Sequence, residues 1–173
     1  MHFTDARNLL LGLAASQQVK DSPLVVSMLG DARCIDFGNT KGASVLPYDG
    51  ALIDDKILSE CSFGMAVDAI LSAMSEGEFA DEEGEPFDVA ITVSRSNGGV
   101  GLSAIIRFQT MHQFMQWDFN ASNPDFEGLD SEAANRLARE RISSPESAHF
   151  EQTTRIGKMM LETLANFIAG ANE

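Results

Sequence analysis

The sequence predicts a single α+β domain, spanning residues 1–173, in which an antiparallel sheet packs against helices. Three observations support this class: a strong hairpin pattern near residue 97, short β-like segments near the N-terminus, and apolar stripes of helical period between and after them. Because the expected strands pair locally and helices separate the groups, we expect α+β and not a parallel doubly wound sheet. A chain of this length forms a core without a metal or disulfide.

The first element is expected to be a helix over about residues 5–18. Thr4 is a suitable N-cap, and Leu9, Leu10 and Leu13 recur at helical spacing. Asp21-Ser22-Pro23 then ends the helix.

An N-terminal meander of two or three strands should follow. The segments 24–29 and 32–37 are rich in apolar and β-branched residues, and Gly30-Asp31 between them suits a type II′ turn. This pairing sets Val26 opposite Ile35. A third short strand over 43–46 would end at Pro47.

A second helix is expected from Phe63 to Met74, with an apolar stripe on one face. Ser62 or Asp54 could cap it, and Gly77 should end it. The acidic stretch from Glu76 to Pro86 reads as an exposed loop.

The clearest local signal is a hairpin of 87–95 with 100–108, because Asn97-Gly98 between them is the strongest short-range hairpin marker. Pairing across this dipeptide places one apolar set on one face of both strands. The predicted opposite pairs are Val93 with Leu102, Ile91 with Ala104, Val89 with Ile106, Phe87 with Phe108, and, on the other face, Asp88 with Arg107 and Thr92 with Ser103.

The C-terminal third is expected to be mainly helical. Residues 109–119 fit either a helix or a strand, and a short helix is expected over 131–142, with Ala134, Leu137, Ala138 and Ile142 facing inward. Ser143 and Glu146 have capping-box spacing, which predicts one long helix from there to Ile168, ending at Gly170. Its expected apolar face consists of Phe150, Ile156, Met160, Leu164, Phe167 and Ile168.

The net charge of −14 equals the acids of two segments without basic residues, one lying between Lys56 and Arg95 and the other between Arg107 and Arg136. This distribution argues against direct binding to nucleic acid or to anionic membranes, and it suits a basic protein partner. A solvated surface that keeps the protein soluble is the more common reason for such a charge.

No catalytic or cofactor motif stands out. The glycines of Asn97–Ser103 belong to the expected hairpin turn, so we expect no nucleotide site there. His2, His112 and His149 lack metal-ligand spacing, and Cys34 and Cys61 suit small buried positions better than nucleophiles. We therefore expect no cofactor, no metal and no enzymatic activity.

The cellular compartment is expected to be the cytoplasm. Two cysteines are too few for a secreted disulfide framework, and no window approaches the roughly 18 apolar residues that cross a bilayer. Asp5 and the lack of a basic leader predict a first helix and not a signal peptide.

The stretch from Val67 to Thr110 resembles the class I type III secretion chaperones. It comprises a helix (VDAILSAM), a short acidic loop and the hairpin GEPFDVAITVSRSNGGVGLSAIIRFQT. Proteins of that group are small, acidic, cytoplasmic and commonly dimeric, and they hold an extended segment of a partner. The resemblance implies strand or groove addition without a nucleotide, with Leu9, Leu13, Val26 and Ile35 as first contact candidates, and a possible homodimer.

Two other functions stay open. An acidic inhibitor that imitates nucleic acid, of antidefence or nuclease-immunity type, would use carboxylates against a DNA- or RNA-binding protein. Its contact residues would be Glu76, Glu78, Asp81, Glu82, Glu83, Glu85, Asp118, Asp125, Glu127, Asp130 and Glu132. An enzyme without a recognisable motif would show a pocket with a strongly perturbed titratable group.

Overall fold

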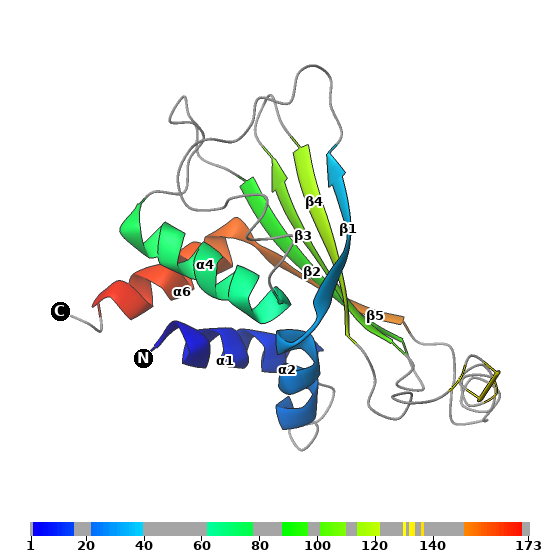
Figure 1. The fold of residues 1–173 in the computed structure, drawn as a ribbon. Helices are drawn as coiled ribbons and strands as arrows, with labels where there is room; N and C mark the ends of the chain where they lie inside the picture. The colour runs from blue at the N-terminus through cyan, green and yellow to red at the C-terminus, as the bar shows by residue number, and fades with distance from the viewer. Residues whose placement is uncertain are drawn as a thin grey trace.

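The fold is an antiparallel sheet with helices on one of its faces, as a computed structural model of the chain shows (Figure 1). The structure describes residues 2–15, 22–39, 62–77, 88–96, 101–109, 114–121, 130, 132–133, 136 and 151–170. The elements in chain order are α1 (Phe3–Ala15), α2 (Ser22–Gly30), β1 (Arg33–Asn39), α4 (Phe63–Glu76), β2 (Asp88–Ser96), β3 (Leu102–Gln109), β4 (Phe114–Ala121), β5 (Glu151–Gly157) and α6 (Lys158–Gly170).

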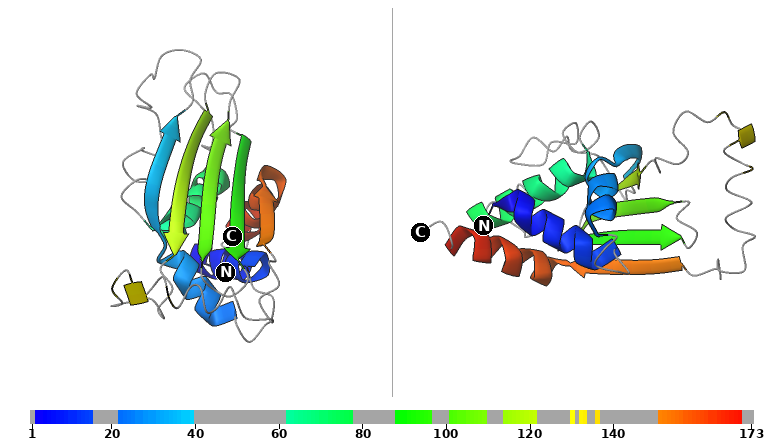
Figure 2. Two further views of the ribbon diagram at one scale, coloured as in Figure 1. Left: turned by 90° about the vertical axis from the view of Figure 1, so that its right-hand side faces the viewer. Right: turned by 90° about the horizontal axis from the view of Figure 1, so that it is seen from below.

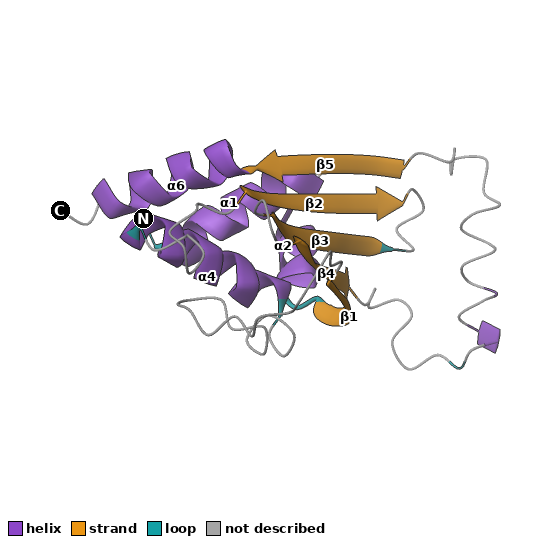
Figure 3. Cartoon of the chain, turned by 90° about the horizontal axis from the view of Figure 1, so that it is seen from above, coloured by secondary structure: helices purple, strands orange, loops and turns teal. Residues whose placement is uncertain are grey.

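The five strands form one sheet in the order β1-β4-β3-β2-β5, and every neighbouring pair is antiparallel. The helices cover one face of this sheet, and the described residues leave the other face uncovered (Figures 2 and 3). The α+β class predicted from the sequence is therefore confirmed.

The predicted N-terminal meander is wrong, because Ser22–Gly30 forms helix α2 and not a strand. Val25 and Leu29, four residues apart, are both buried on one helical face. Pro23 is tolerated because the first turn of a helix needs no N–H at that position. The possible third strand over 43–46 lies outside the described residues.

Strand β1 confirms the predicted strand over 32–37 but pairs with β4, which is distant in sequence. The ladder shifts between Cys34 and Asp36, so Ile35 is the extra residue of a bulge. Ile35 therefore faces no residue of 24–29, and the expected pairing with Val26 is wrong.

Helix α4 begins and ends where the sequence predicts. The Ser62 side chain accepts a hydrogen bond from the backbone N–H of Met65 (3.4 Å). Gly77 adopts the left-handed conformation (φ 73°), and its N–H bonds to the carbonyls of Ala73 and Met74.

The hairpin of β2 and β3 exists, but its register differs by two residues from the prediction. Val93 lies opposite Ala104, and Asp88 lies opposite Gln109 instead of Arg107. A two-residue shift keeps each side chain on its face, so the apolar set remains buried. The prediction failed because the last pair before the turn is not Ser96 with Gly99; instead Arg95 pairs with Leu102.

The ambiguous segment 109–119 contributes a strand, β4. Met115, Trp117 and Phe119 alternate with more exposed residues and are buried. The alternation of buried and more exposed residues has the period of two that is typical of a strand, so the strand alternative for this segment is the correct one.

The predicted long C-terminal helix is wrong over residues 151–157. These residues form edge strand β5, which pairs with β2 throughout, and within the described part of the predicted helix the helical residues are Lys158–Gly170. Ile156 is buried, as predicted, but it belongs to a strand of the sheet and not to a helix. The expected cap at Ser143 and the inward residue Phe150 lie outside the described residues.

The buried stripe of α6 also differs from the prediction. Leu161, Ala165 and Ile168 are buried, whereas Met160 and Phe167 are exposed. Of the helix predicted over 131–142, the structure describes only residues 132, 133 and 136, which are helical, and none of its expected inward residues.

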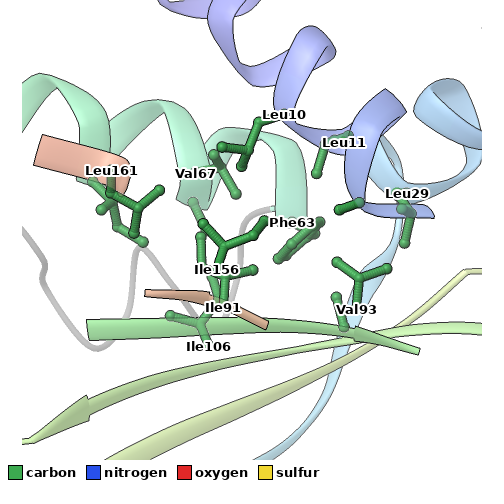
Figure 4. Packing of buried hydrophobic residues seen from close by; sticks show 14 of the residues in the cluster. Leu10, Leu11, Leu29, Phe63, Val67, Ile91, Val93, Ile106, Ile156 and Leu161 are labelled. Carbon is green, nitrogen blue, oxygen red and sulfur yellow. The ribbon is translucent and has the colours of Figure 1, made fainter. Parts of the chain in front are cut away.

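One hydrophobic core lies between the helices and the sheet (Figure 4). Phe63 of α4 packs on Phe119 with ring centroids 5.3 Å apart, and Phe108 meets Trp117 edge-on at 5.1 Å. Among the described residues, every buried residue of this core is apolar, and no polar or charged residue is buried.

Candidate functional site

Helix α4 is held to α1 by an ion pair and lies against the end of α2 through a close backbone approach. Nη1 of Arg7 donates to Oδ2 of Asp68 at 2.7 Å, and the Arg7 guanidinium also bonds Oδ1 of Asn8. A Cβ at Gly64 would stand 2.9 Å from the carbonyl oxygen of Gly30 and 3.1 Å from Nη1 of Arg7. The position admits only glycine without a shift of backbone.

The Asp68 carboxyl is partly buried, with 27% of its side chain exposed. Burial raises its pKa above the ordinary value, and the Arg7 guanidinium lowers the pKa but offsets only part of this effect. Among the described residues, Oδ1 of Asp68 finds no hydrogen-bond partner. This geometry is a contact between helices α1 and α4.

The orientation of α1 leaves two leucines in solvent. Leu10 points toward Val67 of α4 (Figure 4), and Leu11 is fully buried in the core. Leu9 and Leu13, on the remaining side of α1, are 52% and 71% exposed. They are four residues apart, so they form a continuous apolar stripe on the helix. We call Leu9 and Leu13 the α1 stripe.

The other two predicted contact residues do not join the α1 stripe. Val26 is only partly buried and packs against the core from α2. Ile35 is 66% exposed, but it belongs to β1, at the opposite edge of the sheet from β5, which α1 contacts.

Sequence reasoning missed several other exposed apolar side chains. The described residues of this kind beyond the four candidates are Leu24, Met65, Met159, Met160 and Phe167. Three of them lie on α6, where the expected long helix assigned the wrong inward face.

The acidic candidates are described only in part. Glu78, Asp81, Glu82, Glu83, Glu85, Asp125 and Glu127 lie outside the described residues. Glu76 ends α4, whereas Asp130 and Glu132 belong to a segment on the other side of the molecule (Figure 1, yellow). Oδ1 of Asp130 accepts a hydrogen bond from the N–H of Ala133 at 2.8 Å. The described acids thus do not gather on one surface.

Asp118 belongs to a hydrogen-bonded chain on the uncovered face of the sheet. Nε of Arg107 donates to Oε1 of Gln116 at 2.8 Å. Nε2 of Gln116 in turn donates to both carboxylate oxygens of Asp118, at 3.0 and 3.1 Å. This carboxylate is therefore already bonded within the sheet face.

The described residues can be searched for metal-ligand groups and for the candidate cysteine and histidines. No group of three His, Cys, Asp or Glu side chains there could hold a metal ion. Cys34 packs against the core from β1, as a small apolar residue would. His112 and His149 lie outside the described ranges.

Comparison with known proteins gives no match: no protein-family model, no curated protein and no solved structure matches this chain. Within the described ranges, no helix has both the length and the apolar character needed to cross a membrane.

Proposed function

We propose that this protein is a non-enzymatic protein-binding module that holds a segment of a partner protein against the α1 stripe. The observation that carries the proposal is the exposure of Leu9 and Leu13 on a helix whose other side is firmly packed. Neighbouring exposed leucines at helical spacing are a usual feature of surfaces that bind another protein.

The packing of α1 supports a role in binding because it makes the stripe rigid. Ala6, Leu10, Leu11, Ala14 and Ala15 anchor the helix in the core, and Arg7 ties it to α4. A rigid surface loses little conformational entropy when a partner binds, so apolar contacts contribute more of their free energy to affinity.

The partner that this surface fits is an apolar segment of another protein, held in an extended or helical form without a nucleotide. This agrees with the adaptor role that the resemblance to secretion chaperones implies, and with action in the cytoplasm. An inhibitor that acts through its carboxylates would need its acids on one surface, and the described acids lie on separate elements.

The experiment is affinity capture from native cell extract with the wild-type chain and with a Leu9→Ser/Leu13→Ser variant. Both residues are exposed, so the variant should fold normally. Met65→Ser, which removes an exposed apolar side chain from α4, is the matched control. We expect the partner to be lost with the α1 variant and kept with the control. Equal recovery with all three chains would contradict the proposal.

A further inference from the structure

The two cysteines of the chain, Cys34 and Cys61, are far apart in the sequence, but the fold brings their neighbours together. Cys34 is the second residue of β1, and Cys61 directly precedes Ser62, the N-cap of α4. The start of α4 lies beside the start of β1 (Figure 1). Arg33, the first residue of β1, forms an antiparallel bridge with Ser62 on the edge of β1 that β4 leaves open.

A backbone hydrogen bond and an extended residue fix the geometry of this bridge. The N–H of Phe63 donates to the carbonyl of Ala32 at 2.9 Å. Ser62 has an extended backbone (φ −76°, ψ 160°), as strand pairing requires. A hydrogen bond on that flank makes Arg33 and Ser62 a pair of the non-hydrogen-bonded kind. The next pair along the same ladder is therefore of the hydrogen-bonded kind, because the two kinds alternate.

One further step along this antiparallel ladder would set the two cysteines opposite each other. The step advances β1 from Arg33 to Cys34 and goes back from Ser62 to Cys61, which a single peptide bond joins to Ser62. Opposite residues of a hydrogen-bonded pair have Cα atoms about 5.5 Å apart and side chains on the same face. A disulfide joins residues whose Cα atoms are about 4.4–6.8 Å apart, so this spacing suits one.

The side chain of Cys34 lies on the face of the sheet that the helices cover. Cys34 pairs with Phe119 of β4, which is buried on that face, and Cys34 itself packs against the core. It is only partly buried, so a small thiol reagent can reach its sulfur. A disulfide at this place would join the open edge of the sheet directly to the start of α4.

We infer that Cys34 and Cys61 form a reversible disulfide that locks β1 to the start of α4 under oxidising conditions. With glutathione disulfide as the oxidant, one cysteine thiolate attacks it, which forms a mixed disulfide and releases one glutathione. The second cysteine then attacks the protein sulfur of the mixed disulfide and releases the other glutathione. The two protein thiols thus lose two electrons and two protons, and one glutathione disulfide becomes two thiols. The bond does not involve the α1 stripe, so it can be tested apart from the proposed partner binding.

Equilibration of the chain in glutathione buffers of increasing disulfide content tests the pair. Intact mass distinguishes an internal disulfide, which loses two hydrogen atoms, from a glutathione adduct, and peptide mapping identifies the two joined cysteines. We expect an internal disulfide whose equilibrium constant is at least about tenfold larger for the folded chain than for the chain in urea. The reason is that the fold raises the effective concentration of one thiol at the other.

The matched control moves one thiol by a single residue, to the other face of β1. Arg33 is exposed, and Arg33→Cys/Cys34→Ser leaves the length of the closed loop almost unchanged, so in urea this variant should close as readily as the wild type. In the folded chain its two thiols lie on opposite faces, so we expect an equilibrium constant at least about tenfold below that of the wild type. Glutathione adducts that persist on the folded wild type, or equal closure by the folded wild type and the folded control, would overturn the inference.

Discussion

The Arg7 guanidinium of α1 and the Asp68 carboxylate of α4 meet at 2.7 Å, and burial nevertheless leaves the pKa of Asp68 raised. The attraction of the pair is thus weaker than the cost of removing the carboxylate from water. Removing each partner should therefore have a different effect on stability.

We expect Arg7→Met to lower the free energy of unfolding by about 1–2 kcal/mol, because it leaves a partly buried carboxylate without its ion pair. Asp68→Asn removes the desolvation cost together with the attraction, so it should stay within about 1 kcal/mol of the wild type. Urea unfolding of both variants measures the difference. Equal losses for the two would contradict this account of the pair.

The raised pKa of Asp68 also predicts a pH dependence. A carboxyl whose pKa is higher in the folded state binds its proton more tightly there, so protonation favours folding. The free energy of unfolding of the wild type, relative to Asp68→Asn, should therefore increase as the pH falls from about 7 toward about 4, near the ordinary Asp value. A relative decrease over this range would contradict the direction of the shift.

Gly64 should be sensitive to the addition of a side chain. The Cβ of Gly64→Ala would stand 2.9 Å from the Gly30 carbonyl, and a backbone atom cannot move away as a flexible side chain would. We expect a loss of about 1–3 kcal/mol, typical of overpacking. Gly30→Ala is the control, because its Cβ meets nothing within 4 Å. Thermal unfolding of the two variants should separate them, and similar melting temperatures would contradict the close helix approach.

Two adjacent positions of α1 test the orientation of the helix. Leu10 is 5% exposed, so Leu10→Ser should cost about 2–4 kcal/mol of stability. Leu9→Ser should change stability by less than about 0.5 kcal/mol, because Leu9 already lies in solvent. Chemical unfolding of both variants provides the comparison. If Leu9→Ser destabilised the chain as much as Leu10→Ser, the α1 stripe would be buried and could not bind a partner.

The elements that sequence predicts well are those with a local physical cause. The caps at Ser62 and Gly77 follow from side-chain and backbone chemistry within a few residues, and both are confirmed. The hairpin follows in the same way from Asn97-Gly98. Its register differs by two residues, because alternation fixes the face of a strand but not its offset along the partner.

The errors arise where distant pairing overrides local pattern. Ile156, Met160 and Leu164 have helical spacing by coincidence across the boundary between β5 and α6. Only pairing with β2, about 60 residues earlier, makes 151–157 a strand, and such pairing leaves no local signal. The α1 stripe is predictable only in part. The sequence suggests Leu9 and Leu13 as contact residues, but their exposure follows from the burial of Leu10 and Leu11, which only the structure shows.

The salt dependence of partner capture tests the central claim most directly. Capture from native extract would be compared at about 50 mM and about 500 mM salt, where the Debye length falls to about 4 Å. The account predicts a partner retained at the higher salt and lost with the Leu9→Ser/Leu13→Ser variant, because an apolar contact is not screened. A basic, nucleic-acid-binding partner that is lost at high salt and is unaffected by that variant would contradict it, and would assign the function to the carboxylates.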